Sequence, residues 1–310
     1  MLRYIIIRIG QGIITAFVLM TIVFIFARIT GNPINLVVPP DADLATRHAA
    51  AVRLGLTQSY FVQYWKYVGG LLKGDFGSSI QYNLPVTQLF LDAVPATIRL
   101  ATVALAFAVI LGVPLGVVSA IRRGKPSDYV ARGWAALAMS APEFWVGIIL
   151  ILIFAVHLRI LPAAGESGPQ SYLLPAFTLS LPVLAGTARL VRSSLVEVMG
   201  NDYIKLARIK GASNASVIWK HGMRNALLPV VTFLGIRLTY LLSGSVVVEA
   251  VFAWPGVGRL MYECVSGQDY PLEQGLLLIL GFLVIGMNII VDIFYIIIDP
   301  RIRIQSNQTR

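Results

Sequence analysis

The stretch Leu100–Ile121, LATVALAFAVILGVPLGVVSAI, has no charged residue, and its only hydroxyl side chains are Thr102 and Ser119. A helix of about 20 apolar residues crosses the roughly 30 Å core of a bilayer. The whole chain has this character: of its 310 residues, 57% are hydrophobic and 13% are charged, whereas a soluble domain has about 25% charged residues. This composition excludes a disordered chain and argues against a soluble globular protein. It indicates a polytopic membrane protein.

Six segments are long and apolar enough to cross a membrane. We place them at residues 9–28, 98–121, 133–156, 171–190, 226–248 and 275–298. Alternating apolar and polar residues, which are typical of membrane barrel strands, are absent from the sequence. The pattern therefore predicts an all-α protein with six transmembrane helices in a single domain, residues 1–310. Gly112 and Gly116 form a G-x-x-x-G pattern in the second span, and this spacing permits close packing of helices.

Lysines and arginines predict the orientation of these spans. They gather before the first span, between the second and third, between the fourth and fifth, and after the sixth, for example Arg8, Arg123, Arg192 and Arg303. Short connections on the cytoplasmic side carry an excess of Lys and Arg, so we expect both termini in the cytoplasm. The net charge of +10 then reflects topology, and nucleic acid is not needed to explain it.

The first of two long connections, residues 31–95, lies outside by this topology. Its apolar residues recur at helical spacing in two short stretches, around Val52 and from Tyr60 to Leu72. Gly74 and Gly77 then interrupt the pattern. Two interpretations remain open: the segment only caps the outer face, or it is a docking surface for an external partner.

The second long connection, residues 197–225, is polar and predicted to be cytoplasmic. Asn201 or Asp202 can cap a helix over Tyr203–Lys210, which Gly211 ends. One face of this helix, by i, i+4 spacing, carries Tyr203, Ala207 and Gly211. Three cations flank that face: Lys205, Arg208 and Lys210. The helix is either a plug for the groove of a cytoplasmic protein or an amphipathic helix on anionic lipid.

Charged residues inside the predicted spans are candidates for a solute pathway, because a charge in the bilayer is costly and usually faces water or another helix. Arg237 lies in the middle of the fifth span, Glu143 follows Pro142 in the third, and Arg99 begins the second. The alternative is a structural ion pair or an interhelical hydrogen bond.

Motifs for other chemistries are missing. The sequence has no G-x-x-x-x-G-K-[ST] phosphate-binding loop and no H-E-x-x-H. Its three histidines, His48, His157 and His221, are far apart, so we expect no shared metal site. Cys264 is the only cysteine and permits no intramolecular disulfide.

Several stretches of the sequence together form a known pattern. In the predicted cytoplasmic segment they are Asp202-Tyr203, Ala207–Gly211 and His221–Pro229. Elsewhere they are Leu54-Gly55-Leu56, Gly74–Gly77, Val248–Leu260, Asp269-Tyr270-Pro271 and Asp299-Pro300-Arg301. Combined, they resemble the permease subunits of ABC importers, in the dipeptide, oligopeptide and nickel group, and the resemblance covers nearly the whole chain.

This resemblance implies a non-enzymatic transport subunit in the bacterial cytoplasmic membrane. It would pair with a second, homologous permease, two cytoplasmic ATPases that bind ATP and Mg²⁺, and an external solute-binding protein. Residues Tyr203–Gly211 would form the coupling helix, which sits in a groove of one ATPase. This favours the plug interpretation. The coupling residues would then be Asp202, Tyr203, Lys205, Ala207, Arg208, Lys210 and Gly211.

Three positions depart from the family pattern: Ile209 replaces a usual alanine, Arg99 stands where relatives are often acidic, and Arg237 stands where glutamine is frequent. If either arginine lines the path, cargo bearing a carboxylate is favoured over a cation. The group carries peptides, glutathione, nickel chelates and sugars, so the cargo stays open. A proton-coupled secondary transporter is the alternative function, although only Glu143 offers a well-placed intramembrane carboxylate.

Overall fold

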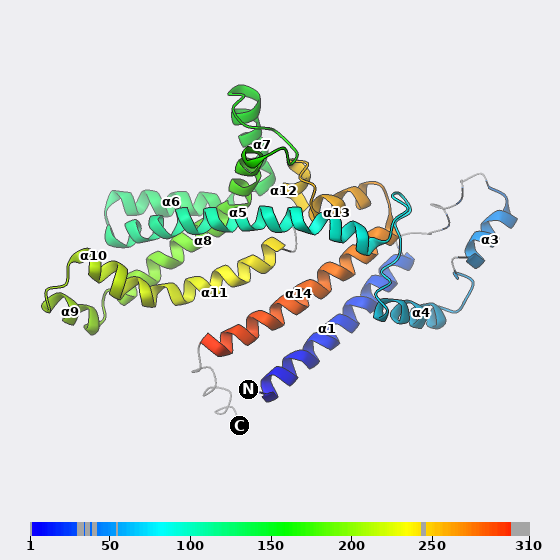
Figure 1. Ribbon diagram of the computed structural model, residues 1–310, viewed down its shortest axis with the longest axis horizontal. Helices are drawn as coiled ribbons and strands as arrows, with labels where there is room; N and C mark the ends of the chain where they lie inside the picture. Colours follow the sequence, from blue (N-terminus) through cyan, green and yellow to red (C-terminus); the bar gives the residue numbers. More distant parts are fainter. Residues whose placement is uncertain are drawn as a thin grey trace. The chain divides into compact units, whose positions relative to one another are not determined.

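The computed structural model describes residues 2–29, 34, 38, 42–53, 55–242 and 246–298. Their regular structure is helical, as predicted, and Figure 1 labels the helices along the chain. One isolated antiparallel bridge joins Ser78 to Pro85. The chain divides into two compact units, Met1–Pro95 with Arg259–Arg310 and Ala96–Gly258. Each is described by itself below.

The helices that could cross a membrane agree with five of the six expected spans. Four are single stretches: Ile5–Phe26, Val86–Ile121, Pro169–Val198 and Tyr270–Val291. A fifth is a pair of helices, Pro126–Ser140 and Glu143–His157, with a bend of 103° between them. The expected third span, 133–156, is therefore not one straight helix. Pro142 lies at the bend, where its ring disfavours a helical conformation at Ala141.

The expected fifth span, 226–248, is not among these stretches. Its residues form most of α11, Met223–Leu242, and the start of α12, Val246–Val251. Residues 243–245 lie outside the described part of the chain. The count of six spans and the cytoplasmic position of both termini stay predictions.

In the first unit, α1 (Leu2–Ile29) packs along α14 (Tyr270–Ile298), as Figure 1 shows. A Cβ on Gly12 would lie 2.7 Å from the Ile289 side chain, and Gly281 lies against Leu19. These pairs show that the two helices run antiparallel. The unit also contains α3 (Leu44–Arg53), α4 (Tyr60–Leu72) and most of α13 (Val257–Ser266).

Asp269 holds the loop of this unit that follows α4. Its Oδ2 accepts hydrogen bonds from Ser79 Oγ (2.5 Å) and the Gln81 backbone N–H (3.0 Å). Its Oδ1 accepts from the Leu272 backbone N–H (3.2 Å) in the first turn of α14. One buried carboxylate thus caps a helix and fixes a loop, because it accepts from both.

The second unit is built around α8 (Leu173–Val198), which is buried along most of its length. Three helices pack on it: α6 (Pro126–Ser140), α7 (Glu143–Leu150) and α11. The part of α5 (Val86–Ile121) from Ala96 on shares its core and approaches it closely. The G-x-x-x-G spacing of α5 serves this packing, as predicted. A Cβ on Gly112 would lie 2.9 Å from the Leu184 carbonyl oxygen, and one on Gly116 would lie 2.6 Å from that of Ala188.

Beyond α8 the chain forms α9 (Asp202–Ile209), α10 (Asn214–Ser216) and a turn of π-helix, Val217–Gly222, that leads directly into α11. A second π-helical stretch, Ile151–His157, continues α7. The polar segment predicted between the fourth and fifth spans is therefore the short helix α9, followed by α10 and the π-helical turn.

Candidate functional site

The α9 segment carries the predicted coupling residues. The helix begins and ends within a residue of the predicted bounds, and Gly211 follows with a φ of +81°, a conformation that favours glycine. Ile204 is fully buried, and Tyr203 accepts a hydrogen bond from Asn225 Nδ2 at 2.8 Å. The helix packs on the π-helical turn Val217–Gly222, and the hydrogen bond between Tyr203 and Asn225 attaches it to the start of α11.

The predicted cap of α9 differs in detail. Asn201 is the capping residue, yet its side chain makes no capping hydrogen bond. Asp202 instead accepts from Lys205 Nζ at 2.8 Å, in an exposed ion pair. Ser213 caps the next helix: its Oγ accepts from the Ser216 backbone N–H at 3.3 Å at the start of α10.

The outer side of α9 is apolar as well as basic. Leu206 is 52% exposed and Ile209 is 82% exposed. The predicted cations Lys205, Arg208 and Lys210 are also exposed, whereas Ala207 is half-buried. Leu206 and Ile209 are three residues apart and share a face with Tyr203. Sequence reasoning chose the face with Ala207 and missed this apolar ridge, although the i, i+3 spacing was its signal.

The carboxylate of Asp128 links three helices, α5, α6 and α8, through one ion pair and several hydrogen bonds. Arg192 on α8 donates from Nε and a terminal nitrogen to the two oxygens of Asp128 on α6, at 2.6 and 2.7 Å. The same carboxylate accepts from Ser119 Oγ on α5 (2.6 Å) and from the Gly124 backbone N–H (3.0 Å). Because this buried aspartate accepts four hydrogen bonds, we call Asp128 and its partners the Asp128 clamp: it fixes the positions of the three helices at this point. The sequence analysis did not single out Asp128, because its partners are distant in sequence.

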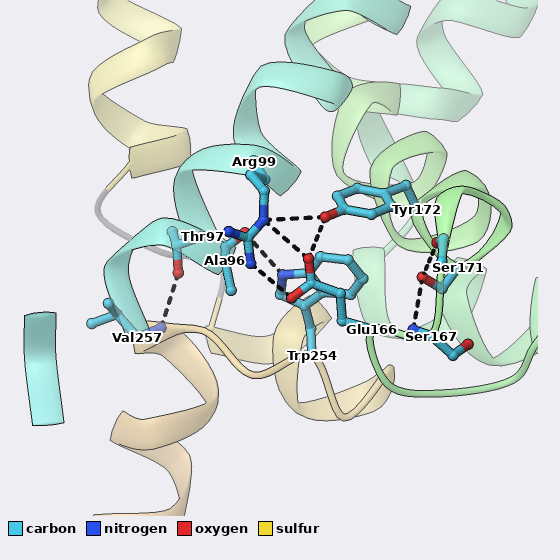
Figure 2. Close-up of polar contacts among 10 residues, drawn as sticks. Ala96, Thr97, Arg99, Glu166, Ser167, Ser171, Tyr172, Trp254 and Val257 are labelled. Atoms are coloured by element: carbon cyan, nitrogen blue, oxygen red, sulfur yellow. Dashed lines mark hydrogen bonds and ion pairs between the residues drawn. The ribbon is translucent and has the colours of Figure 1, made fainter. Parts of the chain in front are cut away.

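Arg99, a candidate for the solute path, is ion-paired. Its guanidinium donates to both oxygens of Glu166 at 3.0 and 2.9 Å and to Tyr172 Oη at 3.2 Å, and Tyr172 also donates to Glu166 (Figure 2). Burial alone would raise the pKa of Glu166, but the hydrogen bonds from Arg99 and Tyr172 outweigh it and hold that pKa below its usual value. The three side chains line an open pocket of about 860 Å³.

Glu143 and Arg237, the other two path candidates, lie in one electrostatic environment. Tyr240 on α11 interacts electrostatically with both of them. The Arg237 guanidinium lies over the Phe233 ring, 5.1 Å from its centroid. Glu143 on α7 and Arg237 on α11 are thus both within electrostatic range of Tyr240, whereas Arg99 belongs to a different cluster.

A buried network explains the stretch after α11 that matches the family pattern. Glu249 accepts from Thr97 Oγ1 (2.9 Å) and the Gly258 backbone N–H (2.8 Å), and Thr97 accepts from the Val257 N–H (2.9 Å). Trp254 is fully buried and donates from its indole N–H to the Ala96 carbonyl oxygen at 3.0 Å (Figure 2). The loop is thereby tied to the start of the second predicted span.

Comparison with known proteins decides the family. The profile described as "Binding-protein-dependent transport system inner membrane component" matches residues 112–304, and its N-terminal companion matches residues 1–101. The chain belongs to this family of ABC importer permeases. It is an integral, multi-pass permease of the membrane.

Relatives of this permease cover its full length. It is 38% identical over 304 residues to the glutathione transport system permease protein GsiC of Escherichia coli (strain K12), which spans 98% of this chain and 99% of the relative. The GsiC of Salmonella choleraesuis (strain SC-B67) matches with the same identity and coverage.

Two solved transporters share the fold of the permease. The inward-facing MetNI methionine ABC transporter aligns with a TM-score of 0.58 at 21% identity, over 69% of this chain and 97% of that chain. An amino acid ABC transporter crystallised with histidines aligns with a TM-score of 0.52 at 17% identity, over 67% and 93%.

Proposed function

We propose that this permease forms one half of the translocation path of an ATP-driven importer. Its partners are a homologous permease, two cytoplasmic ATPases that bind ATP and Mg²⁺, and an external solute-binding protein. The chain itself performs no ATP chemistry. It has six spans in the bacterial cytoplasmic membrane and both termini in the cytoplasm. Family membership leaves the proton-driven alternative without support.

The exposed apolar and basic side chains of α9 support the proposal that this helix docks on an ATPase. A helix of eight residues is too short to be stable alone, and the only residue that α9 buries is Ile204. The side chains it leaves out include large apolar ones, Leu206 and Ile209. Exposed apolar residues rimmed by cations are the pattern of a surface that another protein covers.

The coupling mechanism follows from this docking. When ATP binding closes the two ATPases, the groove that holds α9 moves. The packing of α9 on the π-helical turn Val217–Gly222 and the hydrogen bond between Tyr203 and Asn225 pass that movement to α11, since the turn leads directly into α11. The change is an equilibrium between inward-open and outward-open states that the nucleotide biases by binding one state better.

Charge reversal tests the docking. In a variant with Lys205→Glu, Arg208→Glu and Lys210→Glu, we expect uptake into cells or proteoliposomes to fall at least about tenfold. Three lost surface ion pairs of roughly 0.5 kcal/mol each sum to about 1.5 kcal/mol, slightly more than the roughly 1.4 kcal/mol that a tenfold change requires. Membrane insertion should not change.

The control keeps the charges: Lys205→Arg, Arg208→Lys and Lys210→Arg together should transport nearly as well as the wild type. Normal uptake by the charge-reversed protein, at equal amounts in the membrane, would count against the docking assignment.

For the cargo, we propose a small peptide or a related solute with a carboxylate. The glutathione permease relatives support a peptide-like cargo, and the charges of Arg237 and Glu143, both within electrostatic range of Tyr240, support a polar path. Arg99 is a weaker path candidate because Glu166 already neutralises it.

Arg237→Gln tests this path. It should reduce uptake of acidic cargo while ATP hydrolysis by the complex continues, because glutamine keeps hydrogen bonding but cannot attract a carboxylate. The same substitution at the paired Arg99 should have the smaller effect on uptake. Unchanged uptake in Arg237→Gln would remove Arg237 from the path.

A further inference from the structure

The helix α4 carries a surface that the transport function does not explain. Three large apolar side chains project from it without cover: Phe61 is 73% exposed, Trp65 is 50% exposed and Leu72 is 81% exposed. In a helix with about 100° between successive residues, these three lie within roughly 40° of one another. They form one apolar stripe.

A different side of α4 is packed against the two spans of the first unit. Tyr64 Oη is 2.7 Å from Thr21 Oγ1 on α1, and the Tyr64 ring packs edge-on against Phe24, with 5.2 Å between centroids. Leu71 is buried in a cluster with Val23 on α1 and Leu278 on α14. The contacts of α4 are thus with the membrane-crossing helices themselves.

The positions of these contacts give the depth of α4. Val23 comes five residues before Arg28, the charge that ends the apolar run of α1, and Leu278 comes five residues after Glu273, which precedes that of α14. At 1.5 Å per residue, Val23 and Leu278 each lie about 7–8 Å inside their apolar runs. Thr21 and Phe24, seven and four residues before Arg28, lie about 10 and about 6 Å inside. Both spans therefore give a similar depth. Amphipathic helices that lie in the membrane surface are buried by about 5–10 Å.

The remaining side of α4 fits that depth. Lys66 is exposed and lies about 120–140° around the helix from Phe61 and Leu72. It is the only charged residue within α4. A helix lying flat in the interface needs one apolar edge toward the acyl chains and one polar edge toward water, and tryptophan and tyrosine favour this layer.

We propose that α4 lies in the membrane–water interface and inserts Phe61, Trp65 and Leu72 among lipid acyl chains, with Lys66 on the water side. The interface is the one at the end of α1 remote from its N-terminus. The occupant of the stripe is lipid, and α4 anchors α1 and α14 to that leaflet. This inference is independent of the proposed cargo and of the ATPase contact.

Nitroxide labels test the proposal in the complete importer, reconstituted in phospholipid nanodiscs. Single-cysteine labels at Phe61→Cys, Trp65→Cys and Lys66→Cys are compared by their relaxation with oxygen, which concentrates in lipid, and with a water-soluble nickel chelate. The native Cys264 is buried. Ile13→Cys, on the exposed face of α1, is the lipid standard, and Lys125→Cys, exposed in the connection between α5 and α6, is the water standard.

We expect labels at positions 61 and 65 to behave like the label at 13, with oxygen access several times nickel access. The label at 66 should reverse that ratio. Nickel access at 61 and 65 equal to that at 125 would place the stripe in water and overturn the proposal. Protection of 61 and 65 from both reagents would overturn it too, because another protein would then cover the stripe.

Discussion

Removing the charge of Asp128 should unfold this permease at a distinctly lower temperature. The carboxylate accepts four hydrogen bonds, from Arg192, Ser119 and Gly124. In Asp128→Asn the side chain keeps one carbonyl oxygen, but an amide N–H₂ replaces the other oxygen. This donor then faces groups that are themselves donors, so their hydrogen bonds are lost. Breaking one partner of a buried ion pair costs about 3–5 kcal/mol.

The lower end of that range applies, because Arg192 keeps 21% of its side chain exposed and can recruit water. We therefore expect a loss of about 3 kcal/mol. For a protein of this size, 1 kcal/mol corresponds to about 2–4 °C in Tm, so the expected shift is about 6–12 °C. The measurement is thermal unfolding of the purified protein in detergent, followed by tryptophan fluorescence.

Two comparisons make the result decisive. Asp202→Asn breaks the ion pair with Lys205, in which both side chains are exposed to solvent. The Tm of this variant should therefore stay within error of the wild type. In a double-mutant cycle, Arg192→Met should cost much less in the Asp128→Asn background than in the wild type, by about 1–3 kcal/mol. If Asp128→Asn lowers Tm no more than Asp202→Asn, the clamp does not hold the bundle.

Two further predictions concern single side chains. Gly256→Ala should lower stability by about 1–3 kcal/mol, because its Cβ would lie 2.5 Å from Thr97 Oγ1 and collide with the Glu249 carboxylate; Gly286→Ala, where nothing lies within 4 Å, should not lower Tm. Burial raises the pKa of Cys264 to about 12, so at pH 8 the thiolate is about 1000-fold scarcer than for a thiol of ordinary pKa 9. Maleimide should label it only after denaturation, and rapid labelling of the folded protein would contradict its burial.

Much of the architecture could be predicted from the order of residues. A transmembrane helix needs apolar side chains along its own length, because lipid surrounds it, and it makes its backbone hydrogen bonds within itself. A span such as 98–121 can therefore be recognised from its own consecutive residues. The same holds for the α9 helix, since Gly211 and Ser213 mark its end and the next start within a few residues. Side chains that meet across the bundle have no such local signal.

Three contacts show what only the tertiary structure decided. The Asp128–Arg192 pair joins residues 64 apart, the Arg99–Glu166 pair joins residues 67 apart, and Trp254 donates to Ala96 across 158 positions. From the sequence alone, an arginine such as Arg99 in a span is interpreted as a residue of the solute path. Only the structure shows that the carboxylate of Glu166 neutralises its charge. Hydropathy likewise measures how apolar α4 is, but its depth along α1 comes from packing. Local energetics place an element in a membrane, whereas the partner of each buried charge depends on which helices the fold brings together.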